Sequence, residues 1–107
     1  MLARKDRVLL IAVQLNHHPL GVLRYDLKAA GTAEVNINLR PEKRGKGWGA
    51  AVIRRGNRWI AGKFGIRRIR ARIKTQNGAS KAAFSKAGFL FLKSLPGHDV
   101  YEARLHD

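Results

Sequence analysis

The chain has 107 residues, 45% of them hydrophobic, which is enough for one domain with a single core. It has no cysteine, so disulfides, thiolate metal sites and a covalent thioester on cysteine are excluded. The formal net charge is +15, and residues 43–98 include fifteen Lys or Arg and no acid. We therefore predict one domain over residues 1–107 that attracts anions, whether nucleic acid, an acidic membrane or a phosphorylated small ligand.

The first part of the chain predicts three strands. Aliphatic and β-branched runs place them at residues 8–15, 22–27 and 33–39, with a turn at 16–21 and a loop at 28–32. Because the first run is too short for a bilayer, we interpret it as a strand rather than a signal peptide or membrane span, and we expect a cytoplasmic protein with no membrane partner. The third run alternates an apolar face with a polar face formed by Glu34, Asn36 and Asn38.

The next ten residues, 40–49, read RPEKRGKGWG and connect the third strand to a helix. Their three glycines let the backbone turn tightly and leave its N–H groups uncovered at the positive end of that helix. Two lysines and an arginine lie alongside, so the stretch predicts a site for phosphate or pyrophosphate. A flexible basic loop is the alternative, but it does not explain glycines at every second position.

Two common phosphate-binding patterns fail for this stretch. A Walker-type loop requires Ser or Thr directly after Gly-Lys, and here Gly47 follows Lys46. A dinucleotide fingerprint requires an acidic residue about 20 positions further on, and no Asp or Glu occurs between Lys43 and His98.

The rest of the chain predicts a helix, a strand, a second helix and two strands. The helix spans 48–64, with an apolar side formed by Trp48, Val52, Trp59, Ile60 and Phe64. Residues 66–74 alternate as a strand whose solvated face is Arg68, Arg70, Arg72 and Lys74. A short helix over 79–87 ends at Gly88, and strands at 89–92 and 100–105 flank a turn at Pro96. The order β-β-β-α-β-α-β-β indicates an α/β protein with a mixed (α+β) sheet.

Two segments resemble recurrent motifs of the GNAT N-acetyltransferase family. Residues 44–49 match Arg/Gln-x-x-Gly-x-Gly/Ala, the turn that holds the pyrophosphate of acetyl-CoA in that family. Residues 77–89 resemble its second motif, in which an Asn ending a strand is followed by a short helix and a terminal Gly-Phe. The two segments occur in the family's order, and the resemblance covers residues 8–105. It implies a GNAT-like acyl-CoA N-acyltransferase fold.

The resemblance also implies that acetyl-CoA is the co-substrate, bound where the strands around Leu39 and Ile73 separate. The pantetheine arm would follow the backbone of residues 36–39. The cofactor-binding residues that the resemblance implies are Ile37, Leu39, Arg44, Gly45, Lys46, Gly47, Trp48, Gly49, Asn77, Ser80, Phe84 and Lys86. Many members of the family have, at the position of Phe84, a Tyr that can protonate the leaving thiolate, and Phe84 has no proton to donate.

The polar face of the third strand supplies the candidate catalytic residues, Glu34 and Asn36. Transfer of an acetyl group to an amine needs a group that takes the amine's proton, and Glu34 is the best base, acting directly or through a water. An exposed carboxylate paired to an arginine explains Glu34 equally well. Since there is no cysteine and no Ser-His constellation, we expect direct transfer to a primary amine, possible acceptors being an amino sugar or another small amine.

Alternatives remain for the acceptor site and for the function. The family usually begins with a strand and two helices that build much of the acceptor pocket, whereas this sequence begins at the hairpin. Either another subunit of a homodimer completes the pocket, or the gene start is placed too late, or the protein is degenerate. The basic face of residues 68–74 would also suit a nucleic-acid- or ribosome-associated protein without catalysis, which we favour less. We predict no metal site, because His17 and His18 diverge and no third ligand is evident.

Overall fold

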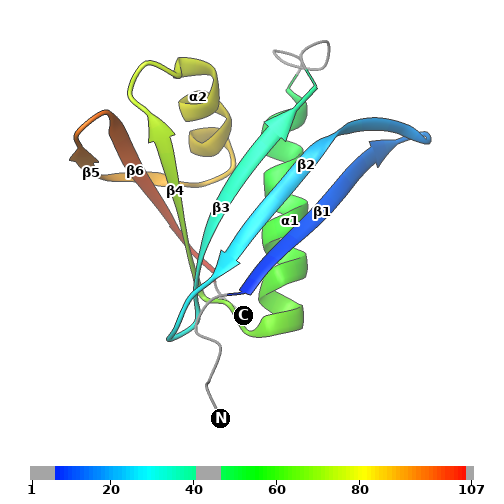
Figure 1. The fold of residues 1–107 in the computed structure, drawn as a ribbon, viewed down its shortest axis with the longest axis horizontal. Coiled ribbons are helices and arrows are strands. Elements are labelled where there is room, and N and C mark those ends of the chain that lie inside the picture. Colours follow the sequence, from blue (N-terminus) through cyan, green and yellow to red (C-terminus); the bar gives the residue numbers. More distant parts are fainter. Residues whose placement is uncertain (1–6, 41–46, 106–107) are drawn as a thin grey trace.

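The computed structural model describes residues 7–40 and 47–105, which form one six-stranded sheet with two helices (Figure 1). In chain order the elements are β1 (Arg7–Leu15), β2 (His18–Leu27), β3 (Thr32–Leu39), α1 (Trp48–Phe64), β4 (Arg68–Lys74), α2 (Gly78–Lys86), β5 (Leu90–Leu95) and β6 (His98–Arg104). The predicted order and the mixed sheet are confirmed, and α1 has the predicted bounds. Neither helix of this described part is long and apolar enough to cross a membrane.

The strands lie in the order β1-β2-β3-β4-β6-β5. All neighbours are antiparallel except β3 and β4, which are parallel and joined through α1. The turn predicted at residues 16–21 is wrong in length: β2 already begins at His18. Asn16 and His17 both have positive φ, 51° and 68°, which gives the two-residue turn that suits a twisted hairpin. Pro19 is accommodated next to a bulge at Leu20 of β2.

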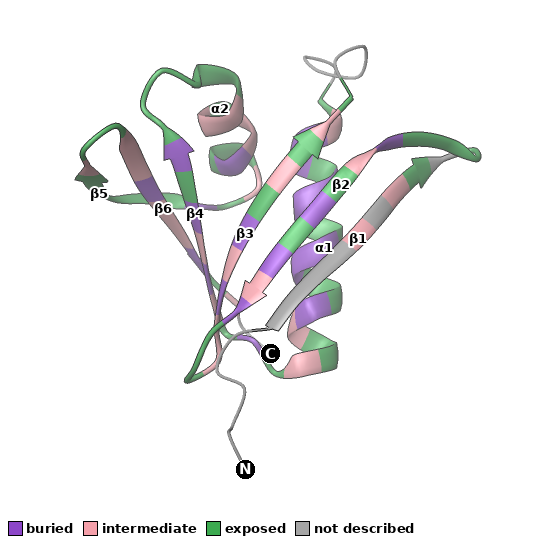
Figure 2. Ribbon diagram, in the orientation of Figure 1, coloured by how far each residue is buried: buried purple, intermediate pink, exposed green. Residues whose placement is uncertain are grey.

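One face of the sheet packs with both helices into a single core. Alternate residues of β2, β3 and β4 are buried, as Figure 2 shows, and their neighbours on the same strands are more exposed. The largest fully buried side chains are Tyr25, Phe84, Phe89, Leu23, Ile53, Ile60, Ile69 and Val35. Burial of a large aliphatic or aromatic side chain contributes about 1.5–3 kcal/mol, so this cluster supplies most of the stability.

Helix α1 approaches β2 closely at Gly56. A Cβ there would lie 2.6 Å from Tyr25 Oη and closer still to Leu23. The glycine therefore lowers helix propensity but permits the contact. At the next position, Asn57 is buried and its Oδ1 accepts a hydrogen bond of 2.7 Å from the Tyr25 hydroxyl.

The apolar side predicted for α1 is wrong at Trp59, which is 47% exposed and stacks edge-on against Phe64. The buried stripe runs through Ile53, Gly56 and Ile60. Trp59 is one residue, about 100° of helix rotation, away from that stripe.

Candidate active site

The sheet opens between β3 and β4. These strands pair only from Thr32 with Arg68 to Val35 with Ala71. Beyond that point both strands continue, β3 to Leu39 and β4 to Lys74, and they diverge (Figure 1). We call this divergence the split. The strands around Leu39 and Ile73 therefore separate as predicted, and the last four residues of β3 lack β4 as a partner.

The backbone of β3 turns its hydrogen-bonding groups alternately to its two sides. The Arg40 N–H donates to the Leu20 carbonyl at 2.8 Å, and the Arg68 N–H donates to the Gly31 carbonyl at 3.2 Å. Since successive residues of a strand face opposite neighbours, the even-numbered residues of β3 bond to β2 and the odd-numbered ones face β4. The N–H and C=O of Ile37 therefore point into the split.

A cleft of about 600 Å³ lies beside the split, walled by the end of β3, the start of α1 and one side of α2. Its walls are Ile37, Asn38, Leu39, Gly47, Gly49, Ala50, Asn77, Ala79, Ser80, Ala82, Ala83 and Lys86. Most of these side chains are small. A Cβ at Gly49 would lie 3.1 Å from the Ala83 Cβ, so α1 and α2 nearly touch at the floor. Such an arrangement admits an extended, slender ligand.

The helices that wall the cleft begin in different ways. Gly47, the N-cap of α1, has φ of 81° and supplies no side-chain acceptor to the first turn, which contains no acid. The first N–H groups of a 17-residue helix therefore favour an anion at this end. In α2 the N-cap is Asn77, whose Oδ1 accepts from the Ser80 N–H at 3.0 Å. The side-chain amide oxygen of Asn77 is thus occupied in capping α2.

The residues predicted to bind the cofactor divide into three groups. Seven line the cleft, namely Ile37, Leu39, Gly47, Gly49, Asn77, Ser80 and Lys86. Phe84 and Trp48 do not line it. Phe84 is buried and packs edge-on against Phe89 with ring centroids 5.0 Å apart, and Trp48 packs against the core. Arg44, Gly45 and Lys46 lie outside the described residues.

Sequence reasoning missed four residues of the cleft wall, Ala50, Ala79, Ala82 and Ala83, whereas Asn38 lies in the stretch 36–39 expected to follow the pantetheine arm. The alanines of α2 could have indicated in the sequence that one side of this helix borders a cleft. A helix of nine residues with three alanines and two serines presents a surface too small to fill the core by itself. Here that surface faces the cleft.

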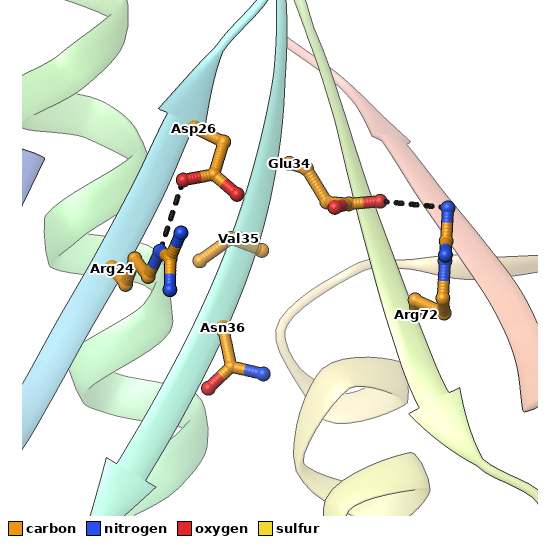
Figure 3. Close-up of a pocket in the computed structure, with 6 residues that line it drawn as sticks. All are labelled: Arg24, Asp26, Glu34, Val35, Asn36 and Arg72. Atoms are coloured by element: carbon orange, nitrogen blue, oxygen red, sulfur yellow. Dashed lines mark hydrogen bonds and ion pairs between the residues drawn. The ribbon is translucent and has the colours of Figure 1, made fainter. Parts of the chain in front are cut away.

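A second, polar pocket of about 280 Å³ lies at the split and is lined by Arg24, Asp26, Glu34, Val35, Asn36 and Arg72 (Figure 3). It brings together both predicted catalytic residues. The Arg24 Nε lies 3.0 Å from Asp26 Oδ1. Across the split, Arg72 Nη2 lies 3.6 Å from Glu34 Oε2. Glu34 is thus placed beside the split and is also paired to an arginine, so both of its predicted roles remain compatible with its position.

The strand register explains why these side chains meet. Asp26 stands directly opposite Glu34, and Arg24 opposite Asn36, in the β2–β3 pair. Arg72 is the first residue of β4 after the last β3–β4 pair. Asn36, in the pocket, and Ile37, in the cleft, are consecutive, so the pocket and the cleft lie beside the split on opposite faces of β3. Asp26 and Arg72 could not be found from the sequence without this register.

The basic face predicted for residues 68–74 is largely engaged in ion pairs. Glu102 on β6 lies 3.0 Å from Arg70, 3.6 Å from Arg68 and 3.7 Å from Arg104. Arg72 contacts Glu34. Three arginines of the predicted row therefore already face carboxylates, which weakens the interpretation of this face as a track for phosphates.

Solved structures of several acetyltransferases share this fold. The structure is similar to the PaiA N-acetyltransferase from Thermoplasma acidophilum in complex with coenzyme A, at TM-score 0.79 and 20% identity, covering 92% of this chain and 61% of that one. It is also similar to the aminoglycoside acetyltransferase AAC(6')-Ib in complex with coenzyme A and kanamycin, at TM-score 0.77 and 17% identity, covering 91% and 66%.

The microcin C7 self-immunity acetyltransferase MccE, in complex with acetyl-CoA and AMP, gives TM-score 0.77 at 19% identity over 92% of this chain and 61% of that one. The chain thus spans 61–66% of the length of these structures. No curated protein sequence matches it significantly. The model of the acetyltransferase (GNAT) domain matches residues 2–90, most of the sequence. The chain therefore belongs to the GNAT acetyltransferase family.

Proposed function

We propose that this chain binds acetyl-CoA in the cleft and transfers the acetyl group to the nitrogen of a small primary amine in the polar pocket. The observation that supports it most strongly is that the cleft and the pocket border the same split, where the consecutive residues Ile37 and Asn36 line one each. Acetyl-CoA supplies a thioester whose carbonyl carbon accepts the amine.

The residues present fit such a ligand. The C=O of Ile37, directed into the split, suits an arm that contains amides, because it can accept a hydrogen bond as in a neighbouring strand, and the Ile37 N–H is left for the thioester carbonyl. The small side chains of α2 leave room for that arm. The start of α1, with an N-cap glycine and no acid in its first turn, suits phosphates.

In the proposed reaction the amine nitrogen forms a bond to the acetyl carbon, and the carbon–sulfur bond breaks. Glu34 takes the proton of the amine, directly or through a water, and the Asn36 amide orients the nitrogen. The Ile37 N–H stabilises negative charge on the carbonyl oxygen. Phe84 is buried and has no proton to donate, so the thiolate leaves as an anion or takes a proton from water.

The structural neighbours include enzymes named for aminoglycosides and for spermidine, which are amines. They support a small amine, an amino sugar included, as the acceptor class of this chain. The proposal extends to direct transfer, because the sequence has no cysteine that would form a covalent intermediate.

Calorimetric titration with acetyl-CoA tests the binding step. We expect saturable one-to-one binding that persists at 0.3 M salt. Ala82→Glu places a negative charge on the cleft wall and should lower the affinity at least roughly tenfold. Ser85→Glu changes the charge equally on the same helix, but at an exposed residue outside the cleft, and should bind like the wild type. Equal loss in both variants, or binding that disappears with salt as for any polyanion, would reject the cleft as the site.

The role of Glu34 is tested by Glu34→Gln. Loss of a general base typically lowers kcat by about 10²–10⁴-fold, whereas the affinity for acetyl-CoA should stay the same because Glu34 lies in the pocket and not in the cleft. If kcat falls less than about threefold, Glu34 serves only as the partner of Arg72.

A further inference from the structure

The polar pocket combines two carboxylates with two guanidinium groups. Asp26 and Glu34 stand opposite each other on neighbouring strands, where like charges would repel if unpaired. Each faces an arginine instead, Asp26 with Arg24 at 3.0 Å and Glu34 with Arg72 at 3.6 Å (Figure 3). The pocket is therefore dipolar, with no net excess of negative charge, in a protein of net charge +15.

Arg72 has the position and the exposure to bind a ligand. It comes from β4, directly after the last residue paired to β3, so its side chain reaches across the opening of the split. Its side chain is 55% exposed. The 3.6 Å contact with Glu34 is an ion pair and is too long for a hydrogen bond of good geometry. A guanidinium has five N–H donors and binds a carboxylate or phosphate through two parallel hydrogen bonds.

This charge arrangement discriminates among amines. A polycationic amine would bring positive charge against Arg24 and Arg72, where neither carboxylate is unpaired. An amine with an anionic group of its own matches both ends of the pocket, because Glu34 and Asp26 face its ammonium and Arg72 faces its anion. The volume of about 280 Å³ corresponds to about nine water molecules, which is enough for a compact acceptor.

We infer that the acceptor is a compact primary amine with its own anionic group, a carboxylate or a phosphate, and that Arg72 binds this anion and determines specificity. The inference rests on the proposed function, since it concerns the acceptor of the same reaction. It separates this chain from acetyltransferases whose acceptors are polycations.

Bisubstrate adducts test the inference by binding alone. Coenzyme A is joined through a thioacetyl link to the nitrogen of glycine, of aminomethylphosphonate, of glycinamide or of ethylenediamine, and each adduct is titrated calorimetrically beside coenzyme A. Glycine and glycinamide have nearly the same shape, so their ratio reports the anion. We expect the glycine or the aminomethylphosphonate adduct to bind about tenfold tighter than the glycinamide adduct, and the ethylenediamine adduct to bind most weakly. The order of the two anionic adducts decides between carboxylate and phosphate.

Arg72→Gln should reduce that tenfold preference to less than about twofold. Arg104→Gln is the matched control, because it removes the same charge from an exposed arginine that pairs with Glu102 outside the pocket, and it should keep the preference. The inference would be overturned, while coenzyme A still binds, if neither anionic adduct bound tighter than the glycinamide adduct, if the ethylenediamine adduct were preferred, or if the anion preference survived in Arg72→Gln. If coenzyme A and all adducts fail to bind, the proposed function falls first and the inference with it.

Discussion

Strand β3 behaves differently in its two halves. Residues 32–35 pair with β4, residues 33–35 pair with β2 as well, and two of them, Ala33 and Val35, are buried. Residues 36–39 keep β2 but have lost β4, and their side chains line the pocket and the cleft. The same alternating sequence therefore supports the core in one half and offers backbone groups to a ligand in the other. The difference arises from the neighbouring strand and not from the local composition of β3.

The largest effect on stability is expected in the paired half. Ile69 is fully buried and pairs with Ala33 on one side and Ala103 on the other. Ile69→Ala should lower the free energy of unfolding by about 3 kcal/mol through lost burial and a residual cavity. Ile37→Ala, in the split half and only partly buried, should cost about 1 kcal/mol but weaken acetyl-CoA binding. Urea unfolding and calorimetry measure both, and equal destabilisation by the two variants would contradict the distinction.

Two glycines of α1 allow a packed position to be compared with a solvent-facing one on the same helix. Gly56→Ala should destabilise by about 2 kcal/mol, because its Cβ has no room beside Leu23 and Tyr25. Gly62→Ala places the same methyl group on the same helix in open space and should stabilise by about 0.5–1 kcal/mol. Stabilisation by both variants, measured by urea unfolding, would show that helix propensity outweighs packing at Gly56.

Tyr25 stands opposite Val35, the last residue of the paired half. Tyr25→Phe leaves the buried Asn57 Oδ1 without its donor and should cost about 1.5 kcal/mol at pH 7. Burial raises the pKa of the Tyr25 phenol above its usual range. A raised pKa in the folded state means that the stability due to the neutral phenol is complete below about pH 10 and is lost as the pH rises further. The gap in stability between wild type and Tyr25→Phe should therefore narrow between about pH 10 and 11, and a constant gap would argue against a buried neutral phenol.

The smallest effect on stability concerns α2, which forms one wall of the cleft. Lys81 on α2 lies 2.8 Å from Asp99 on β6 and ties that helix to the sheet. Hydrogen bonds from Lys81 and Ser94 hold the pKa of the Asp99 carboxyl below its usual range. A lowered pKa means that this contribution is present above about pH 4 and is lost on acidification. Asp99→Asn should thus have a slightly lower Tm than wild type at pH 7, and this Tm difference should shrink as the pH falls below about 4; a difference that does not change with pH would assign the effect to packing.

Much of the fold could be predicted from local patterns. The alternation of apolar and polar residues located β3 and β4. Gly65 ends α1 in the left-handed conformation that glycine favours, with φ of 67°. The start of β2 was missed because Pro19 and Gly21 suggested a turn, whereas the strand continues through both. Gly21 lies against the Asn38 backbone of β3, where a side chain would not fit.

The site could be predicted only in part, because half of it depends on partners distant in sequence. Asn36 and Ile37 follow from the alternation of one strand. Asp26 and Arg72 reach the pocket through the register of β2, β3 and β4, which no local pattern encodes. Phe84, the one residue of α2 that is buried, packs in the core and does not line the cleft.

The central claim is that the split half of β3 binds acetyl-CoA and the paired half does not. Backbone amide NMR during a titration of the ¹⁵N-labelled protein with acetyl-CoA tests it most directly. The account predicts saturable shifts for Ile37, Gly47 and Ser80, small shifts for Ala33 and Ile69, and the same pattern at higher salt. Shifts that spread instead over the exposed arginines of α1, Arg54, Arg55 and Arg58, and fade with salt would contradict it and would indicate nonspecific binding to a basic surface.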